Sequence, residues 1–90
     1  MVKSYYPFQF IEVDTEKLWE EIGENIKEVR KSKKITVEEV SKRTQIDTRY
    51  LYRIERGCPC SLKKLYVIAH SLGCKLEKLV DVEECIKYDI

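Results

Sequence analysis

A chain of 90 residues is long enough for one domain with one hydrophobic core, and its 43% of hydrophobic residues argues against an intrinsically disordered protein. No apolar run approaches the roughly 18 residues that a membrane-spanning helix needs, and the start lacks the unbroken apolar stretch of a secretory signal. We therefore expect a cytoplasmic protein that makes no membrane contact and keeps its cysteines reduced.

The net charge of +1 conceals an uneven distribution along the chain. Residues 27–64 carry twelve Lys or Arg against five Asp or Glu, whereas residues 1–26 and 65–90 are both net acidic. A basic segment between acidic ends indicates a face that binds a polyanion. The alternative is a solvated helical surface, and charge alone does not separate the two.

The first fourteen residues are aromatic and β-prone, and they contain Pro7. Because proline cannot serve a central strand, residues 1–14 are predicted to form an extended arm or an edge strand. The aromatic side chains that alternate along this arm are Tyr6, Phe8 and Phe10.

The middle of the chain, residues 15–80, carries apolar side chains at steps of three and four residues, which is the spacing of helices with one buried face. Residues that favour helix N-termini precede the first four of these runs. The predicted helices span about 15–32, 37–44, 48–56, 62–72 and 76–79. The predicted N-caps are Asp14 or Thr15, Thr36, Asp47 and Ser61.

Two further local signals sharpen these boundaries. Thr36 and Glu39 have the spacing of a capping box, and Gly57 and Gly73 are placed to end the third and fourth helices. The fourth helix is predicted to bury its apolar positions, which are Leu62, Leu65, Ile68, Ala69 and Leu72.

The tail, residues 81–90, alternates apolar and polar side chains at Ile86, Tyr88 and Ile90. This period of two predicts a strand or a dimerisation segment. We expect it to pair with the aromatic arm, either within one chain or across a dimer; a lid of the arm over the first helix is the alternative.

Two short helices joined by a brief turn, the second rich in exposed arginine, are typical of a helix-turn-helix arrangement. In that arrangement the first helix braces the second, which enters the major groove of DNA. The residues over about 20–79 resemble the phage-repressor and Cro-like (XRE-type) helix-turn-helix family. The resemblance is carried by Ile22-Gly23, Ile26, Val29-Arg30, Ile35 to Ser41, Ile46 to Leu51, Arg53 to Gly57, and Ser61-Leu62 to Leu72-Gly73.

The resemblance implies an all-α domain of five helices, with room for short β segments at both ends, that binds a near-palindromic double-stranded DNA operator as a homodimer. It implies a structural ion pair between Arg30 and Glu55, which links the first helix to the third. It also implies base contacts from the start of the third helix. The expected base-contacting residues are Thr48, Arg49, Tyr50 and Arg53, and the expected phosphate-contacting residues are Arg43, Tyr52 and Arg56.

The sequence departs from the family pattern at three places. Val37 stands where the family commonly has glutamine, so a phosphate contact is expected to be missing. Gln45 stands where the turn commonly has glycine, and a non-glycine residue at positive φ is unfavourable but tolerable. The loop at residues 58–60 is about one residue short.

The cysteines suggest no metal site of usual spacing. Cys58 and Cys60 are separated by one residue, whereas structural zinc prefers two or more, and they are too close for an easy mutual disulfide. We expect ordinary packing for these two cysteines, for Cys85 and for Cys74, which is expected to be buried. Metal binding and a redox-sensing thiol pair are the alternatives. No catalytic set is visible, so we expect neither an enzyme nor a cofactor.

Two functions fit these observations. The first is a transcriptional regulator, a repressor that occupies a promoter. The second is an antitoxin or another protein-interaction module that uses the same fold to bind a toxin or other partner. A steep salt dependence of DNA binding would favour the first.

Overall fold

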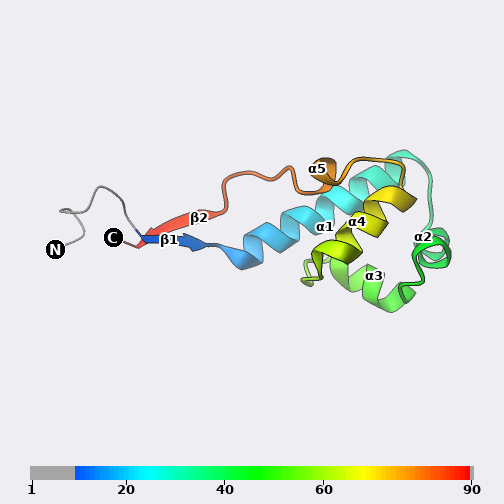
Figure 1. The fold of residues 1–90 in the computed structure, drawn as a ribbon, viewed down its shortest axis with the longest axis horizontal. Helices are drawn as coiled ribbons and strands as arrows, with labels where there is room; N and C mark the ends of the chain where they lie inside the picture. The colour runs from blue at the N-terminus through cyan, green and yellow to red at the C-terminus, as the bar shows by residue number, and fades with distance from the viewer. Residues whose placement is uncertain (1–9, 90) are drawn as a thin grey trace.

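The computed structural model describes residues 10–89, which form five helices and two short strands. The helices pack together at one end of the molecule, and the strands form an arm that projects from them (Figure 1). The predicted five-helix fold with β segments at both ends is therefore confirmed. The elements are β1 (Phe10–Val13), α1 (Thr15–Ser32), α2 (Val37–Thr44), α3 (Thr48–Glu55), α4 (Leu62–Ser71), α5 (Leu76–Leu79) and β2 (Ile86–Asp89).

The helix starts follow the caps that the sequence predicts. Asp14 caps α1 by accepting a hydrogen bond from the Lys17 amide at 3.3 Å, and Ser61 caps α4 through the Lys64 amide at 3.1 Å. Such caps satisfy amides that have no partner inside the helix, and losing one costs about 1 kcal/mol.

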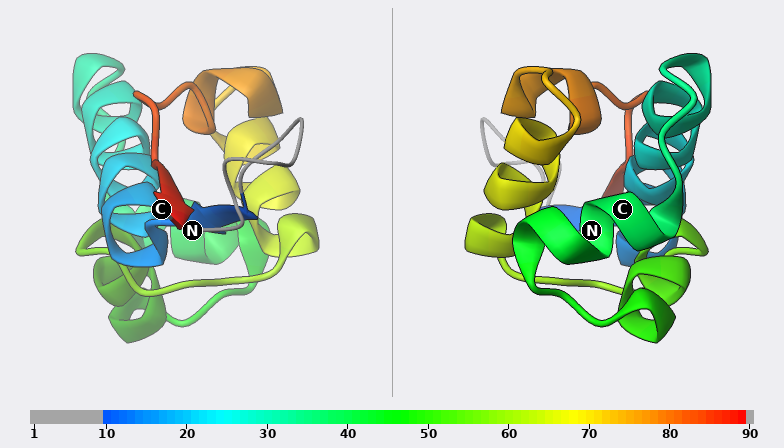
Figure 2. Two further views of the ribbon diagram at one scale, coloured as in Figure 1. Left: turned by 90° about the vertical axis from the view of Figure 1, so that its left-hand side faces the viewer. Right: turned by 90° about the vertical axis from the view of Figure 1, so that its right-hand side faces the viewer.

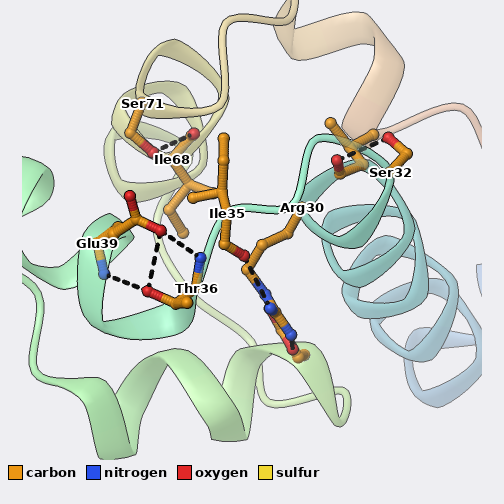
Figure 3. A network of polar contacts seen from close by, with 9 residues as sticks. Arg30, Ser32, Ile35, Thr36, Glu39, Ile68 and Ser71 are labelled. Carbon is orange, nitrogen blue, oxygen red and sulfur yellow. Dashed lines mark hydrogen bonds and ion pairs between the residues drawn. The ribbon is translucent and has the colours of Figure 1, made fainter.

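The capping box at the start of α2 is complete, as Figure 3 shows. The Thr36 hydroxyl accepts from the Glu39 amide at 3.1 Å, and the Glu39 carboxylate accepts from the Thr36 amide at 2.9 Å. These bonds to the backbone and hydroxyl of Thr36 lower the pKa of Glu39. The two residues thereby satisfy two backbone amides at the start of α2 that have no partner inside the helix.

The core lies between α1, α3 and α4 and is closed by α2 and α5 (Figure 2). The side chains of Ile54, Ile68, Leu72 and Leu79 are its most completely buried members. One expected core residue is misplaced: Leu62 is 67% exposed. It is the first residue of α4, and the other four apolar positions, from Leu65 onward, are buried as expected.

Gly23 lets α1 and α3 approach closely. A Cβ atom at this position would lie 2.4 Å from the Ile54 carbonyl oxygen and 2.6 Å from that of Glu55. Real Cβ atoms essentially never come that near to other heavy atoms. The close approach therefore depends on the missing side chain of Gly23.

The strands β1 and β2 pair antiparallel within one chain, with Ile11 opposite Tyr88 and Val13 opposite Ile86. Of the two predicted alternatives, pairing within one chain and pairing across a dimer, the structure shows pairing within one chain. At the base of the arm, the Asp14 amide donates to the Cys85 carbonyl at 2.7 Å. The predicted aromatic positions Tyr5, Tyr6 and Phe8 lie outside the described residues.

The segment between α5 and β2 is tied to α1 by polar contacts. The Asn25 side chain donates to the carbonyls of Leu79 and Asp81 at 3.0 and 2.9 Å. Nearer the arm, Glu21 accepts from the Glu83 amide at 2.9 Å. These bonds hold the returning chain along α1 and bring β2 to β1.

Candidate nucleic-acid interface

The helix α3 has one buried face and one open face. Leu51 and Ile54 point into the core, with 3% and 1% of their surface exposed. The Asp47 side chain caps the helix by accepting from the Arg49 amide at 3.3 Å. The exposed face carries Arg49, Tyr52 and Arg53 and continues into Arg56 at the C-cap. The arrangement presents two arginines and a tyrosine from a firmly anchored helix.

The turn that joins α2 to α3 is held by two hydroxyl side chains from the last turn of α2. The Ser41 hydroxyl donates to the Ile46 carbonyl at 2.5 Å, and the Thr44 hydroxyl accepts from the Ile46 amide at 3.2 Å. Ile46 itself is buried. The orientation of α3 relative to α2 is therefore fixed by hydrogen bonds as well as by packing.

Gln45, at the turn position where the family commonly has glycine, adopts the left-handed conformation with φ of 64°. Its side-chain amide donates to the Lys42 carbonyl at 3.0 Å, which partly offsets the strain. We expect Gln45→Gly to raise the free energy of unfolding by about 0.5–1 kcal/mol, because glycine has no Cβ to clash in this conformation. Thermal unfolding should show a gain of roughly 4 °C in Tm.

The matched control for this prediction is Gln45→Ala. Alanine keeps the Cβ and loses the hydrogen bond to Lys42, so its Tm should be equal to or below that of the parent chain. Equal gains for the two variants would show that the side chain, rather than the backbone conformation, is unfavourable at this position.

The structure brings Arg30 and Glu55 together in a two-point ion pair. Arg30 Nε lies 2.6 Å from Glu55 Oε2, and Nη2 lies 3.0 Å from Oε1. The remaining nitrogen, Nη1, donates to the Ile35 carbonyl at 3.0 Å (Figure 3). Only 12% and 8% of the two side chains are exposed. One guanidinium thus joins α1, the α1–α2 connection and the end of α3.

The hydrogen bonds to Glu55 also raise the pKa of Arg30, against the opposing effect of burial. The guanidinium therefore stays charged in a nearly dry environment. A charge in such a place is stable only with its partner present.

Most of the α3 residues for which base or phosphate contacts are predicted lie at open positions of the helix. Arg49 and Arg53 are exposed, and Thr48 is half-buried in the first turn. Tyr52 is 42% exposed. Together with the exposed Arg56, these side chains form the α3 face, which is the candidate DNA-binding surface.

Two predicted contacts have side chains that are already engaged within the chain. The Tyr50 hydroxyl donates to the Pro59 carbonyl at 3.3 Å, and the Lys64 ammonium lies 5.9 Å from the centre of its ring. Burial raises the pKa of Tyr50. Arg43 donates to the Ser71 carbonyl at 2.7 Å, at the end of α4. As DNA contacts, Tyr50 and Arg43 stay predictions.

Sequence reasoning missed a second basic residue that binds the end of α4. Lys33 Nζ donates to the carbonyls of Leu72 and Gly73 at 2.7 and 3.1 Å. With Arg43 it satisfies three carbonyls that the helix leaves free. Because Lys33 is nearly forty positions away from these carbonyls in the chain, no local pattern indicates the contact.

The departures from the family pattern have visible consequences. Val37 is only 2% exposed, so its side chain belongs to the core rather than to the candidate DNA-binding surface.

All four cysteines are free thiols. Cys58, Cys60 and Cys74 are half-buried, so Cys74 is less buried than expected, and Cys85 is buried. Burial raises the pKa of Cys60 and of Cys85, which disfavours their thiolate forms.

No group of three or more potential metal ligands gathers anywhere within residues 10–89. Over the same residues, no helix combines the length and the apolar character that crossing a membrane would require.

The fold and the open face of α3 define a helix-turn-helix DNA-binding domain. The sequence model of the helix-turn-helix family HTH_3 matches residues 26–79, and the chain belongs to this XRE-type family of regulators. No curated protein sequence matches the chain.

Solved structures with the same fold support this assignment. The regulator SinR, crystallised in complex with DNA, is 29% identical with a TM-score of 0.62 over 67% of this chain and 98% of that one. The clp gene regulator ClgR from Corynebacterium glutamicum is 26% identical, with a TM-score of 0.68 over 71% and 84%. The restriction-modification controller C.AhdI from Aeromonas hydrophila, 24% identical with a TM-score of 0.65 over 68% and 94%, shares the fold.

Proposed function

We propose that this chain is a transcriptional repressor that recognises a specific double-stranded DNA sequence by placing α3 in the major groove. The observation that carries the proposal is the division of α3 into a locked face and an open one. Leu51 and Ile54 anchor it in the core and Glu55 is held by Arg30, so the backbone from which the arginines of the open face project has a fixed orientation. A rigidly held helix of this kind fits the width of the major groove.

The residues of the α3 face divide by position. Thr48, Arg49 and Arg53 are proposed to contact base edges, because the first turns of a recognition helix enter the groove most deeply. An arginine there can hold guanine O6 and N7 with two hydrogen bonds. Tyr52 and Arg56 are proposed to contact phosphates, which position the protein without specifying sequence. The related regulator SinR, at 29% identity, was crystallised in complex with DNA, which supports DNA binding by this chain.

We further propose that the chain acts as a homodimer on a near-palindromic operator. One α3 spans only one half-site, and two copies related by a two-fold axis would contact half-sites about 34 Å apart. A cytoplasmic location follows from this proposal.

A second candidate is a protein-interaction role, such as that of an antitoxin bound to its toxin. It is supported by the related regulator SinR, at 29% identity, which has also been crystallised in complex with the protein SinI. The two roles are compatible, since the α3 face and a partner-binding surface need not overlap. Purification of the chain with its genomic neighbours would reveal a partner that stays bound at high salt.

Selection of bound duplexes from random DNA tests the main proposal most directly. A conserved sequence with two inverted half-sites is the expected result, and the spacing of the half-sites gives the geometry of the dimer. Binding should weaken steeply with salt, because phosphate contacts release counterions. Recovery of no preferred sequence would reject sequence-specific recognition.

Arg53→Ala and Arg56→Ala should have different effects on DNA binding. The first should cost about 1–3 kcal/mol on the selected operator and relax the preference at one base position. The second should weaken binding to all sequences alike and lower the salt slope by about 1. Titration of each variant with the operator and with single-base changes measures both effects. Equal, sequence-independent losses would contradict the base-contacting role of Arg53.

A further inference from the structure

The arm formed by β1 and β2 carries apolar side chains that the other described residues leave exposed. Ile11 is 65% exposed, Val13 is 49% exposed and Ile86 is 37% exposed. Ile11 and Val13 are two positions apart on β1, so they lie on the same face of the ribbon, and Val13 is paired with Ile86 across the strands. One face of the arm is therefore apolar.

The arm is also incomplete as a β structure. Among residues 10–89 the sheet has two strands, so within that range the outer edge of each strand has no partner. An isolated ribbon of two strands is marginally stable in water, and it becomes stable when a further strand or a packed surface covers it. The arm projects beyond the helices, which leaves its apolar face uncovered by them (Figure 1).

We propose that the arm is the surface through which two copies of this chain assemble, its apolar face packing against the arm of the second copy. This inference deepens the proposed function, since it names the contact that joins the copies on adjacent half-sites. The molecule measures 53 Å along its longest axis and only 21 Å and 19 Å across. The arm extends along this longest axis (Figure 1), so it carries its apolar face away from the helices.

The direction of the arm favours the same occupant. Figure 1 shows the arm leaving the bundle sideways from α1, whereas α3 lies along the lower side of the bundle. The view along the arm in Figure 2 agrees, with α3 below it. When α3 rests on DNA, the arm therefore extends beside the duplex rather than toward it or straight away from it. A neighbouring copy is the partner found in that direction.

The size of the arm sets the strength of the contact. Four residues of strand span about 13 Å, so the described arm offers much less than the roughly 800 Å² per partner of a standard stable interface. We expect association in the micromolar range and cooperative occupation of paired half-sites.

The test compares an arm variant with a control of equal exposure. Ile11→Thr combined with Ile86→Thr removes apolar surface but keeps β-branched side chains that favour strands. The control is Leu62→Thr, because Leu62 is 67% exposed and lies on α4, away from the arm. Sedimentation equilibrium of the full chain should show that the arm variant raises the dimer dissociation constant at least about tenfold, whereas the control changes it less than about twofold.

A wild-type chain that stays monomeric up to about 1 mM would overturn the proposal, and so would a dimer weakened by Leu62→Thr but not by the arm variant. Isotope-filtered nuclear Overhauser spectra of mixed labelled and unlabelled wild-type chain give a readout that needs no variant. Contacts between copies should involve the methyl groups of Ile11, Val13 and Ile86. Contacts at Leu62 and Tyr66 instead would place the interface on α4 and reject the arm.

DNA measurements separate this proposal from the proposed function. On the duplex recovered by selection, the arm variant should bind a single half-site like the parent and lose cooperativity on paired half-sites. If selection yields no preferred sequence while sedimentation shows an arm-dependent dimer, the proposed function fails and the arm proposal stands. If single half-sites are bound specifically and paired half-sites without cooperativity, the arm proposal fails and the proposed function stands.

Discussion

Gly23→Ala is expected to lose about 3 kcal/mol of the free energy of unfolding and to lower Tm by roughly 15 °C. The new Cβ would lie 2.4 Å from the Ile54 carbonyl oxygen, 2.6 Å from the Glu55 oxygen and 2.8 Å from the Glu55 carbonyl carbon. All three are backbone atoms, so no rotamer change relieves the contact, and α1 has to move away from α3. For a domain with a total stability of about 5–15 kcal/mol, this is a large fraction.

The sign of this effect makes it a sharp test. In an open helix, glycine to alanine stabilises by about 1 kcal/mol, because alanine has the higher helix propensity. Thermal and urea unfolding should therefore show a loss at Gly23, and little change for Glu24→Ala at the neighbouring exposed position. An unchanged or raised Tm for Gly23→Ala would mean that α1 and α3 are not packed this closely. Because α3 carries the candidate DNA-binding surface, operator affinity should fall as well.

The parts of the fold that sequence could predict are those encoded by neighbours in the chain. The caps at Asp14, Thr36, Asp47 and Ser61 involve residues two or three positions apart; the sequence predicts the last three outright and the first as one of Asp14 and Thr15. The helices follow from apolar spacing in the same way. Leu62 fits that spacing and is still exposed, since periodicity does not say how far a neighbouring element extends.

The arm illustrates a second limit. Alternation of side chains near both ends indicates two strands, and the observed antiparallel pairing joins them within one chain. The sequence left pairing across a dimer equally open, because a strand pattern does not specify its partner. The contacts of Asn25 and Glu21 with residues 79–83, which direct the chain back along α1, span more than fifty positions and leave no local signal.

In the candidate site, the open positions were the predictable ones. Arg49 and Arg53 are exposed because Leu51 and Ile54 occupy the opposite face of α3, and helical spacing alone separates the two sets. Tyr50 borders the buried face, so its hydroxyl finds the Pro59 carbonyl in the loop before α4. Sequence spacing could not reveal this, because the path of that loop is set by tertiary packing.

Glu55→Gln should lower the free energy of unfolding by about 3 kcal/mol, within the range of about 3–5 kcal/mol for breaking a buried pair. Glutamine keeps the shape of the side chain but removes the charge, so Arg30 is left charged with only 12% of its side chain exposed. The glutamine amide also presents a donor to the guanidinium, which has no acceptor. Urea unfolding should show a lower midpoint with an unchanged m value.

Two further variants separate the ion pair from general effects of substitution. Glu28→Gln removes an exposed carboxylate from α1 and should change stability by less than about 0.5 kcal/mol. Arg30→Met added to Glu55→Gln removes the unpaired charge and should recover part of the loss, because a neutral pair needs no buried counter-charge. If the loss of stability in the double variant equals the sum of the losses for Glu55→Gln and Arg30→Met measured singly, the two residues are not coupled. In that case the position of α3 depends on the packing of Leu51, Ile54 and Gly23 alone.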